Sequence, residues 1–345
     1  MTQPTRPIRR LGLTSTLVGL ILVVSACSGD SGADGGDSDQ TLETVRIVSF
    51  NSGLGNVLSH AIEREGFDVA NGFRGEFIRV DPAAATEVFL QGEADVTLQL
   101  DMLVSNLART QGREVTVFAP DFTNNGSIIV REDSDITSPA DLVGRRVGHF
   151  GLESGTTTIF RVLLGRDYGI VLTEDFDLVQ AGAPALVELL AAGEVDAILD
   201  FTPFTERAMV EAGALVLLRA DDPAHGFVPG FAAVAAMESW LRENPELAYA
   251  VRQAVQDAVS FFHDSGYEKL REDPYADLLG VSDEVLDVVI RRAQEARLMT
   301  NEWDSDTVQQ ARAFLREVAE QGVVFNDVPD DNVVVTLEEL LGPPR

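Results

Sequence analysis

Residues 144–164 read GRRVGHFGLESGTTTIFRVLL, and this stretch decides the predicted fold. Val147–Phe150 reads as a short buried strand, which the glycines after it end. Ser154 and the threonines that follow stand where a helix would begin, and both residue types are favoured N-caps. Because a helix start leaves N–H groups free and carries partial positive charge, this turn could hold the polar end of a small ligand. The alternative is that the hydroxyl groups only cap the helix.

The same order of elements occurs twice when the chain is compared with itself at an ungapped offset of 101 residues. Phe50–Asn56 then aligns with Gly151–Thr157, and Gly92–Leu98 aligns with Gly193–Leu199. Each copy contains a Gly-Glu-x-Asp sequence within the order strand, polar turn, helix, strand, helix, strand. Two related α/β units are therefore predicted, the alternative being a chance similarity between two such units.

The first residues resemble an export signal that ends in a lipidation site. Arg6, Arg9 and Arg10 precede an apolar run, Leu11–Val24, that is short for a bilayer span. The sequence VSAC follows and is similar to the bacterial lipobox, whose cysteine, here Cys27, is lipidated. We expect residues 1–26 to be a lipoprotein signal peptide, the alternative being an ordinary signal or a short anchor.

Composition limits the partners and the chemistry of the exported chain. Residues 27–41 are mostly Gly, Ser and Asp, which predicts a flexible tether. Cys27 is the only cysteine, so the chain cannot form an internal disulfide. The net charge of -30 argues against a nucleic-acid partner, because nucleic-acid binding needs a basic surface.

The remaining chain alternates strands with helices of about ten residues, which predicts mostly parallel sheets flanked by helices. The expected strands are Val45–Phe50, Glu76–Val80, Val96–Leu100, Val115–Ala119, Ser127–Arg131, Val147–Phe150, Asp175–Val179, Val195–Asp200, Ala214–Leu218 and Phe231–Ala236.

Two segments read as crossings between two lobes, Asp121–Gly126 and Asp221–Gly230. Residues 42–125 and 232–345 would form lobe 1, and residues 126–231 would form lobe 2. Three late helices are expected to pack on lobe 1, namely Pro245–His263, Asp283–Ala296 and Asp304–Gln321.

This order resembles the type II periplasmic-binding fold, and within it the solute-binding lipoproteins for aliphatic sulfonates, nitrate and thiamine precursors (NMT1/THI5-like). The resemblance covers roughly Leu42–Gly266. It rests on LQGEADVTLQ (90–99), DSDITSPADLVGRRVGHFGLESGTTTIF (133–160), LAAGEVDAILDFTPFTERAMVEAG (190–213) and ENPELAYAVRQAVQDA (243–258), together with the lipobox.

The resemblance implies a function as well as a fold. It implies a monomeric, non-enzymatic protein without cofactors, anchored through Cys27 to the outer face of the cell membrane. There it would hand a small solute to the permease subunits of an ABC importer by hinge closure. The family often has a proline or an aromatic residue where this chain has Asn51-Ser52-Gly53, and a small residue in place of Glu153. Because both positions fall in the expected cleft, the ligand cannot be transferred from the family.

Ligands of open α/β sheets bind outside the carboxyl ends of the strands, which places the candidate site in the loops there. The candidate ligand-binding residues are Asn51, Ser52, Gly53, Asn56, Asp101, Phe122, Asn124, Glu153, Ser154, Gly155, Thr156, Thr157, Asp200, Phe201 and Phe204. Core packing is the alternative for each phenylalanine, as local capping or turn formation is for the polar residues.

The expected cleft loops contain acidic and aromatic residues and no lysine or arginine. The acids are Asp101, Asp121, Glu153 and Asp200, and the aromatic residues are Phe50, Phe122, Phe150, Phe201 and Phe204. Aromatic faces suit a flat ring, and carboxylates suit its N–H donors or a cation. This favours a neutral or cationic nitrogen heterocycle, such as a thiamine-precursor pyrimidine, with sulfonate or nitrate next.

Metal and enzyme signatures are weak. His60, His149, His225 and His263 are scattered without a zinc-binding pattern, so no metal site is expected. One alternative is an exported enzyme on the same fold, a pyrimidine-forming relative, for which His149 is the candidate reactive group. Another is a sensory ligand-binding protein.

Overall fold

The computed structural model describes residues 42–344 with the exception of positions 231 and 302. The predicted signal peptide, the lipidation site Cys27 and the tether lie outside the described residues. Within them, residues 42–344 belong to one compact unit, and none of the helices described there has the length and apolar character to cross a membrane.

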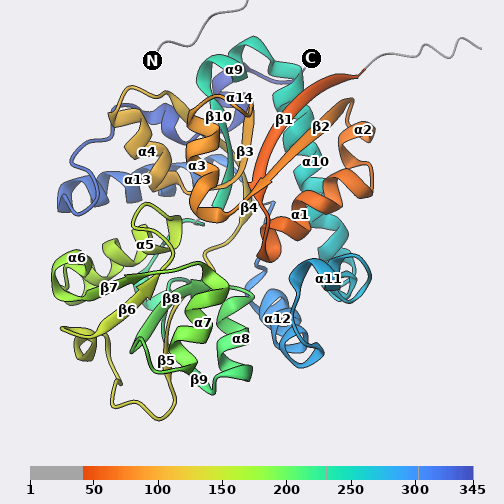
Figure 1. Ribbon diagram of the computed structural model, residues 1–345. Helices are drawn as coiled ribbons and strands as arrows, with labels where there is room; N and C mark the ends of the chain where they lie inside the picture. The colour runs from red at the N-terminus through yellow and green to blue at the C-terminus, as the bar shows by residue number, and fades with distance from the viewer. Residues whose placement is uncertain (1–41, 231, 302, 345) are drawn as a thin grey trace, which may run out of the picture. The chain divides into compact units, whose positions relative to one another are not determined.

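The first sheet contains five strands in the order β2-β1-β3-β10-β4 (Figure 1). They are β1 (Glu43–Phe50), β2 (Phe73–Val80), β3 (Val96–Leu100), β4 (Val115–Phe122) and β10 (Ala232–Met237). β10 runs antiparallel to both of its neighbours, while β1 is parallel to β2 and β3.

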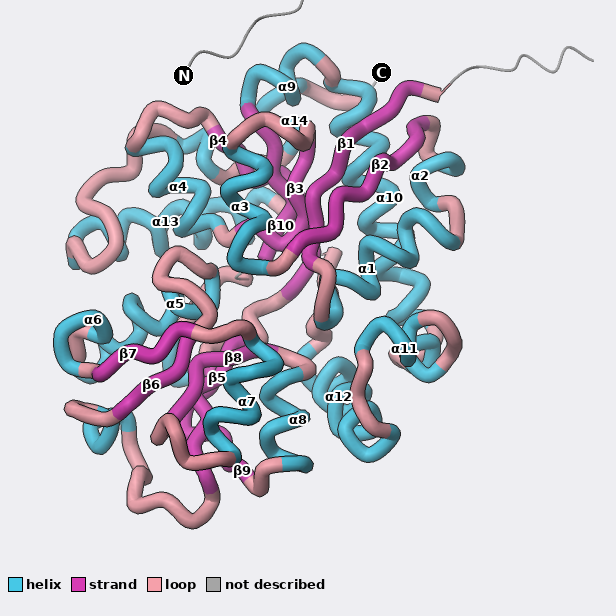
Figure 2. The backbone as a smooth tube through the Cα atoms, viewed as in Figure 1, coloured by secondary structure: helices cyan, strands magenta, loops and turns pink. Residues whose placement is uncertain are grey.

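The second sheet repeats this plan in the order β7-β6-β8-β5-β9 (Figure 2). Its strands are β5 (Gly126–Arg131), β6 (Arg146–His149), β7 (Asp177–Gln180), β8 (Ala197–Phe201) and β9 (Ala214–Arg219). Here β5 is the antiparallel strand. In each sheet the antiparallel strand is the first one after the chain arrives from the other sheet, and the other strands share one direction. The predicted mostly parallel sheets are confirmed.

Helices cover both sheets, and most have the predicted positions. Around the first sheet lie α1 (Gly53–Arg64), α2 (Phe67–Ala70), α3 (Pro82–Leu90), α4 (Met102–Thr110), α9 (Glu238–Glu243), α10 (Pro245–Asp264), α11 (Tyr275–Leu279) and α14 (Leu337–Leu341). Around the second lie α5 (Gly155–Leu163), α6 (Leu172–Asp175), α7 (Ala183–Ala191) and α8 (Phe204–Glu211). A π-helical turn, Leu164–Tyr168, extends α5.

The prediction that the late helices pack on the first lobe is confirmed for α10, whereas α12 (Asp283–Ala296) contacts elements beside both sheets, among them the turn Glu268–Arg271 after α10. α10 buries the apolar stripe that its helical period predicted, against α1, α2 and β4. α12 contacts α8 beside the second sheet, and its Arg292 forms an ion pair with Asp221. α13 (Ser305–Gln321) also reaches that part of the chain, through Glu317 and Arg166. An apolar stripe shows that one face of a helix is buried and leaves open which surface covers it.

The internal repeat is present, with one correction to its register. Arg46 of β1 pairs with Glu76, and Arg146 of β6 pairs with Asp177. The first strands are therefore offset by 100 residues and their neighbours by 101. As a result the counterpart of Phe50 is Phe150 and not Gly151, because one additional residue follows β6.

The repeated Gly-Glu-x-Asp sequence has a structural role in both copies. Asp95 accepts a hydrogen bond from the backbone N–H of Arg46 at 2.9 Å, and Asp196 accepts the equivalent bond from Arg146 at 2.9 Å. The glycine of each copy follows a helix with a positive φ, +80° in the first copy and +71° in the second. The motif fastens the helix end to the first strand of each sheet and lies away from the carboxyl ends of the strands.

Candidate functional site

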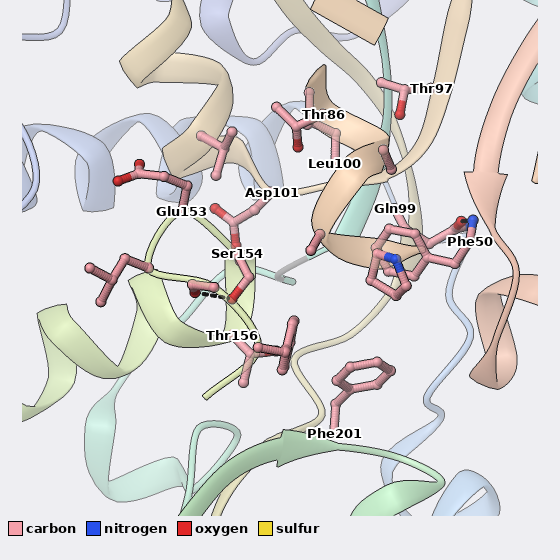
Figure 3. Close-up of a pocket in the computed structure, with 18 of the residues that line it drawn as sticks. Phe50, Thr86, Thr97, Gln99, Leu100, Asp101, Glu153, Ser154, Thr156 and Phe201 are labelled. Atoms are coloured by element: carbon pink, nitrogen blue, oxygen red, sulfur yellow. Dashed lines mark hydrogen bonds between the residues drawn. The ribbon is translucent and has the colours of Figure 1, made fainter. Parts of the chain in front are cut away.

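A cavity of about 360 Å³ lies between the carboxyl ends of strands from both sheets (Figure 3). In the first sheet the chain goes from β1 outward to β2 and from β3 outward to β4, on opposite sides of the central pair, and β6 and β8 do the same with β7 and β9 in the second sheet. Open α/β sheets bind ligands at such switch points. The lining residues are Phe50, Pro82, Ala83, Ala85, Thr86, Thr97, Gln99, Leu100, Asp101, Val104, Phe150, Gly151, Leu152, Glu153, Ser154, Gly155, Thr156, Gln180 and Phe201.

The start of α5 both caps its helix and lines the cavity. The Ser154 hydroxyl accepts from the backbone N–H of Thr157 at 3.4 Å and donates to the carbonyl of Gly151 at 2.8 Å. Thr156 is 1% exposed, and its Oγ1 has no hydrogen-bond partner among the described residues. Both interpretations of this turn therefore hold: Ser154 caps the helix and also lines the cavity, Gly155 and Thr156 contribute to the wall, and the buried Thr157 lies outside it.

Asp101 supplies a buried carboxyl group to the opposite side of the wall. It is the N-cap of α4, and its Oδ1 accepts from the backbone N–H of Leu103 at 2.6 Å. The residue is 2% exposed, and Oδ2 has no partner among the described residues. Burial raises the pKa of Asp101 to about 8, against the opposing effect of backbone hydrogen bonds. The group is therefore mostly protonated at neutral pH.

Gln99 connects the wall to the first crossing. Its backbone N–H and its Nε2 both donate to Oδ2 of Asp121, at 2.8 and 3.0 Å, and its Oε1 accepts from the backbone N–H of Phe50. Burial raises the pKa of Asp121 to about 7. Gln99 has a φ of +58°, a strained conformation for this residue type that the two bonds to Asp121 hold in place.

Three phenylalanines form the aromatic part of the wall. The rings of Phe150 and Phe201 meet edge to face with centroids 5.3 Å apart, and Phe50 is the last residue of β1. Phe204 lies outside the wall and supports Phe201 from behind at 5.4 Å. Phe122 borders a second cavity of about 570 Å³ beside the crossings.

The other predicted residues lie outside the cavity wall. Asn51, Ser52, Gly53 and Asn56 surround the start of α1, where a Cβ on Gly53 would lie 3.3 Å from the Phe201 ring. Asn124 instead joins the two crossings, since its Nδ2 donates to the carbonyl of Pro229 at 3.3 Å.

Asp200 is the predicted acid that the structure separates from the cavity. It is fully buried within β8, and burial, followed by the nearby Glu206, raises its pKa well above its usual range. Its Oδ1 accepts from the backbone N–H of Phe201. The side chain is thus enclosed beneath the wall that Phe201 forms.

A family model described as NMT1/THI5 like matches residues 64–266, which is more than half of the chain. The chain belongs to the NMT1/THI5-like family. No curated protein matches the sequence.

Solved structures share the fold of this NMT1/THI5-like chain at low sequence identity. A protein from Bordetella bronchiseptica has a TM-score of 0.71 and 18% identity, over 87% of this chain and 98% of the other. The periplasmic aliphatic sulphonate binding protein SsuA from Escherichia coli has a TM-score of 0.64 and 16% identity, over 87% and 97%. The desulfurization enzyme DszB has a TM-score of 0.54 and 17% identity, over 86% and 98%. These likenesses confirm the predicted type II periplasmic-binding fold.

Sequence reasoning missed the contribution of α3 to the site of this NMT1/THI5-like protein. Four wall residues, Pro82, Ala83, Ala85 and Thr86, belong to its first turns, and Gln180 is the last residue of β7, the equivalent strand of the second sheet. The signal was present, because α3 follows β2, whose carboxyl end lies at the same sheet edge as β1. The other wall residues absent from the candidate set are Phe50, Thr97, Gln99, Leu100, Val104, Phe150, Gly151 and Leu152.

The charged residues of the wall are both acidic. Asp101 is buried and Glu153 is exposed, and no lysine, arginine, histidine or cysteine is among the described wall residues. His149 lies just outside, where its Nδ1 accepts from the backbone N–H of Gly151 at 3.1 Å and burial lowers its pKa. Among the described residues, no cluster of three His, Cys, Asp or Glu side chains could hold a metal ion.

Proposed function

We propose that this protein is an extracytoplasmic, lipid-anchored receptor that delivers a neutral or cationic nitrogen heterocycle to an ABC import permease. Family membership supports the transport role. The observation that carries the solute class is the cavity wall, which combines three phenylalanines with Asp101 and Glu153 and has no cationic side chain among the residues that the structure describes there. A thiamine-precursor pyrimidine is the first candidate, because it offers a flat ring and several N–H donors or acceptors.

An alkyl sulfonate is the competing solute, and the Escherichia coli neighbour is named for it. The start of α5 could hold an anion through its free N–H groups. A carboxylate about 4 Å from that anion would oppose binding by on the order of 4 kcal/mol at an effective dielectric near 20. Glu153, directly before the Ser154 cap, is placed to exert such an effect. Sulfonate and nitrate therefore rank second.

Transport would depend on closure of two lobes around the solute. We assign residues 42–125 and 232–345 to one lobe and residues 126–231 to the other, with the two crossings as hinges. Because the wall takes residues from both sheets, a bound solute contacts both lobes at once and stabilises the closed form. The permease subunits would then recognise this closed monomer at the outer face of the membrane.

An enzymatic role is the second candidate, favoured by the structural likeness to DszB. Covalent or acid–base catalysis needs a reactive side chain at the bound substrate. The described wall residues offer the carboxyls of Asp101 and Glu153 and the hydroxyls of Thr86, Thr97, Ser154 and Thr156. They include no histidine or lysine that could activate a hydroxyl. A pocket of phenylalanine, hydroxyl and amide groups is better suited to holding a solute than to transforming it.

The test is binding by the chain without its signal peptide, residues 27–345. Thermal shift and calorimetric titration would compare 4-amino-5-hydroxymethyl-2-methylpyrimidine with taurine, an alkanesulfonate and nitrate. A solute at about 100 times its Kd should raise the free energy of unfolding by about 2.7 kcal/mol. Micromolar binding of an anion, with none of the pyrimidine, would overturn the proposed solute class. Turnover of the pyrimidine would overturn the receptor role.

A further inference from the structure

We propose that Asp101 selects a positively charged solute, and that its Oδ2 accepts an N–H from a planar, amidine-like cation while the carboxyl group gives up its proton. This inference rests on the proposed function and narrows its solute class from nitrogen heterocycles in general to those bound as cations.

The geometry of Asp101 leaves one oxygen for a ligand. Oδ1 is used by the N-cap bond to Leu103, whereas Oδ2 is buried and has no partner among the described residues. Asp101 is one of the residues that line the cavity. Figure 3 shows Asp101 among side chains contributed by both sheets. A buried polar atom without a partner is costly, and a solute N–H would satisfy it.

The choice of aspartate at this position is informative. An N-cap needs only an oxygen acceptor, and serine, threonine or asparagine serve equally well. A carboxylate enclosed in this way is unfavourable without a nearby cation, so the group stays protonated unless a cation binds beside it, as its raised pKa indicates. A cationic solute supplies the missing positive charge and converts the contact into a charge-assisted hydrogen bond.

Within residues 42–344, positions 231 and 302 aside, the elements that contact α4 do not supply that cation. Among these elements, β4 carries Asp121, which is an acid and already accepts hydrogen bonds from Gln99. α5 carries Arg161, which donates to the carbonyl of Val323 at 3.1 Å. The turn Asp331–Val333 lies at the opposite end of α4, where Arg109 binds Asp330 and Arg316 binds Asp331. Glu153 is the other charged side chain of the described wall and carries the same sign.

The aromatic residues set the shape of the cation. Phe150 and Phe201 are 7% and 4% exposed, so both rings are fixed within the wall. Aromatic faces attract cations and stack on flat rings. A cavity of about 360 Å³ has the size of a small single-ring solute. The class that fits is a planar ring with an exocyclic or ring N–H that carries positive charge.

A matched pair of probes tests the charge. Benzamidinium and benzamide have nearly the same shape, and only the first is a cation at neutral pH. Titration of residues 27–345 should show benzamidinium binding about tenfold or more tightly than benzamide, a difference of about 1.4 kcal/mol. Repeating the titration in buffers of different ionisation heat should show that benzamidinium releases close to one proton. Equal affinities, no binding of benzamidinium, or no proton release would overturn the inference.

Two variants assign the effect to Asp101. Asp101→Asn keeps an N-cap oxygen for Leu103 and should lose the preference for benzamidinium together with the proton release. Asp81→Asn is the matched control, because Asp81 is an exposed N-cap outside the described wall, and it should retain both effects. If Asp101→Asn fails to fold, the probe pair and the proton count on the unmodified chain still decide the result.

The same titrations separate this inference from the proposed function. If 4-amino-5-hydroxymethyl-2-methylpyrimidine binds and Asp101→Asn leaves its affinity unchanged, the inference is wrong and the receptor proposal stands. If taurine binds and neither the pyrimidine nor benzamidinium does, the proposed solute class is wrong.

Discussion

Asp101→Asn should make the unliganded protein more stable at neutral and alkaline pH and leave it nearly unchanged near pH 4. Burial raises the pKa of Asp101 from 3.8 to about 8 in the folded chain. The folded state therefore holds a proton that the unfolded state has already released, and the free energy of unfolding falls as pH rises between these two values. Asparagine has the same shape and no proton to lose.

The size of the effect follows from the same shift. At about 1.4 kcal/mol per pKa unit, a rise of about 4 units corresponds to an upper limit on the order of 6 kcal/mol above pH 8. At pH 7 the loss in the free energy of unfolding is about 4 kcal/mol on the same reckoning. Even after generous allowance for relaxation and water penetration, a gain of about 2 kcal/mol at pH 7 would be measurable by urea denaturation.

The assay is urea denaturation of the parent chain and the variant at unit steps from pH 4 to pH 8. Asp81→Asn is the matched control, because Asp81 is also an N-cap, accepts from the backbone N–H of Ala83 at 3.0 Å, and is exposed. A stability difference for Asp101→Asn that does not grow with pH, or an equal growth for the control, would refute the reasoning.

Four further predictions follow from other parts of the chain. Phe201→Ala should lower the free energy of unfolding by about 3–5 kcal/mol in urea denaturation, because it removes a buried ring between two others; a smaller loss would show that the site collapses. Asp95→Ala and Asp196→Ala should each cost about 0.5–1.5 kcal/mol in the same assay, since each removes a hydrogen bond to a backbone N–H, with the larger loss for Asp95, which also pairs with the Arg46 side chain; a loss at one site alone would contradict their shared role. Cys27→Ala should remove the protein from washed membrane fractions, and persistence there would contradict the lipobox interpretation. Small-angle scattering should show a smaller radius of gyration when saturating solute is added, and an unchanged radius would count against hinge closure.

The strands and main helices could be predicted because their signals are local. The expected strand Val96–Leu100 agrees residue for residue with β3, and the expected helix Pro245–His263 agrees with α10 to within one residue. Apolar alternation, proline at the first helical turn and glycine after helix ends act within a few residues of the element that they define. Short helices such as α9 and α11 were missed because they are too brief to show a period.

The residues of the site were only partly predictable, because membership of a wall depends on side-chain direction. Asp101 and Asp200 both lie near the carboxyl end of a strand. Asp101 comes after β3 and caps the next helix, whereas Asp200 is still within β8 and is enclosed beside Glu206. One position along a strand reverses the direction of a side chain, and the sequence does not fix where the strand ends. Nor does composition show that Gln99 adopts a positive φ.

Comparing the two copies of the internal repeat distinguishes residues that hold the fold from residues that contact the solute. The equivalent bonds from Asp95 and Asp196 fix the same helix-to-strand junction in both sheets, so these pairs carry no information about the solute. At the strand ends the two copies differ: by the 101-residue offset, Asp101 corresponds to Thr202. Only the first position places a carboxyl oxygen in the described wall. A solute held between the two copies therefore meets a proton-exchanging acid on one side and a helix start with hydroxyl and aromatic groups on the other. Such a cavity favours a solute with one basic edge, and a symmetric anion would leave the acid side unsatisfied.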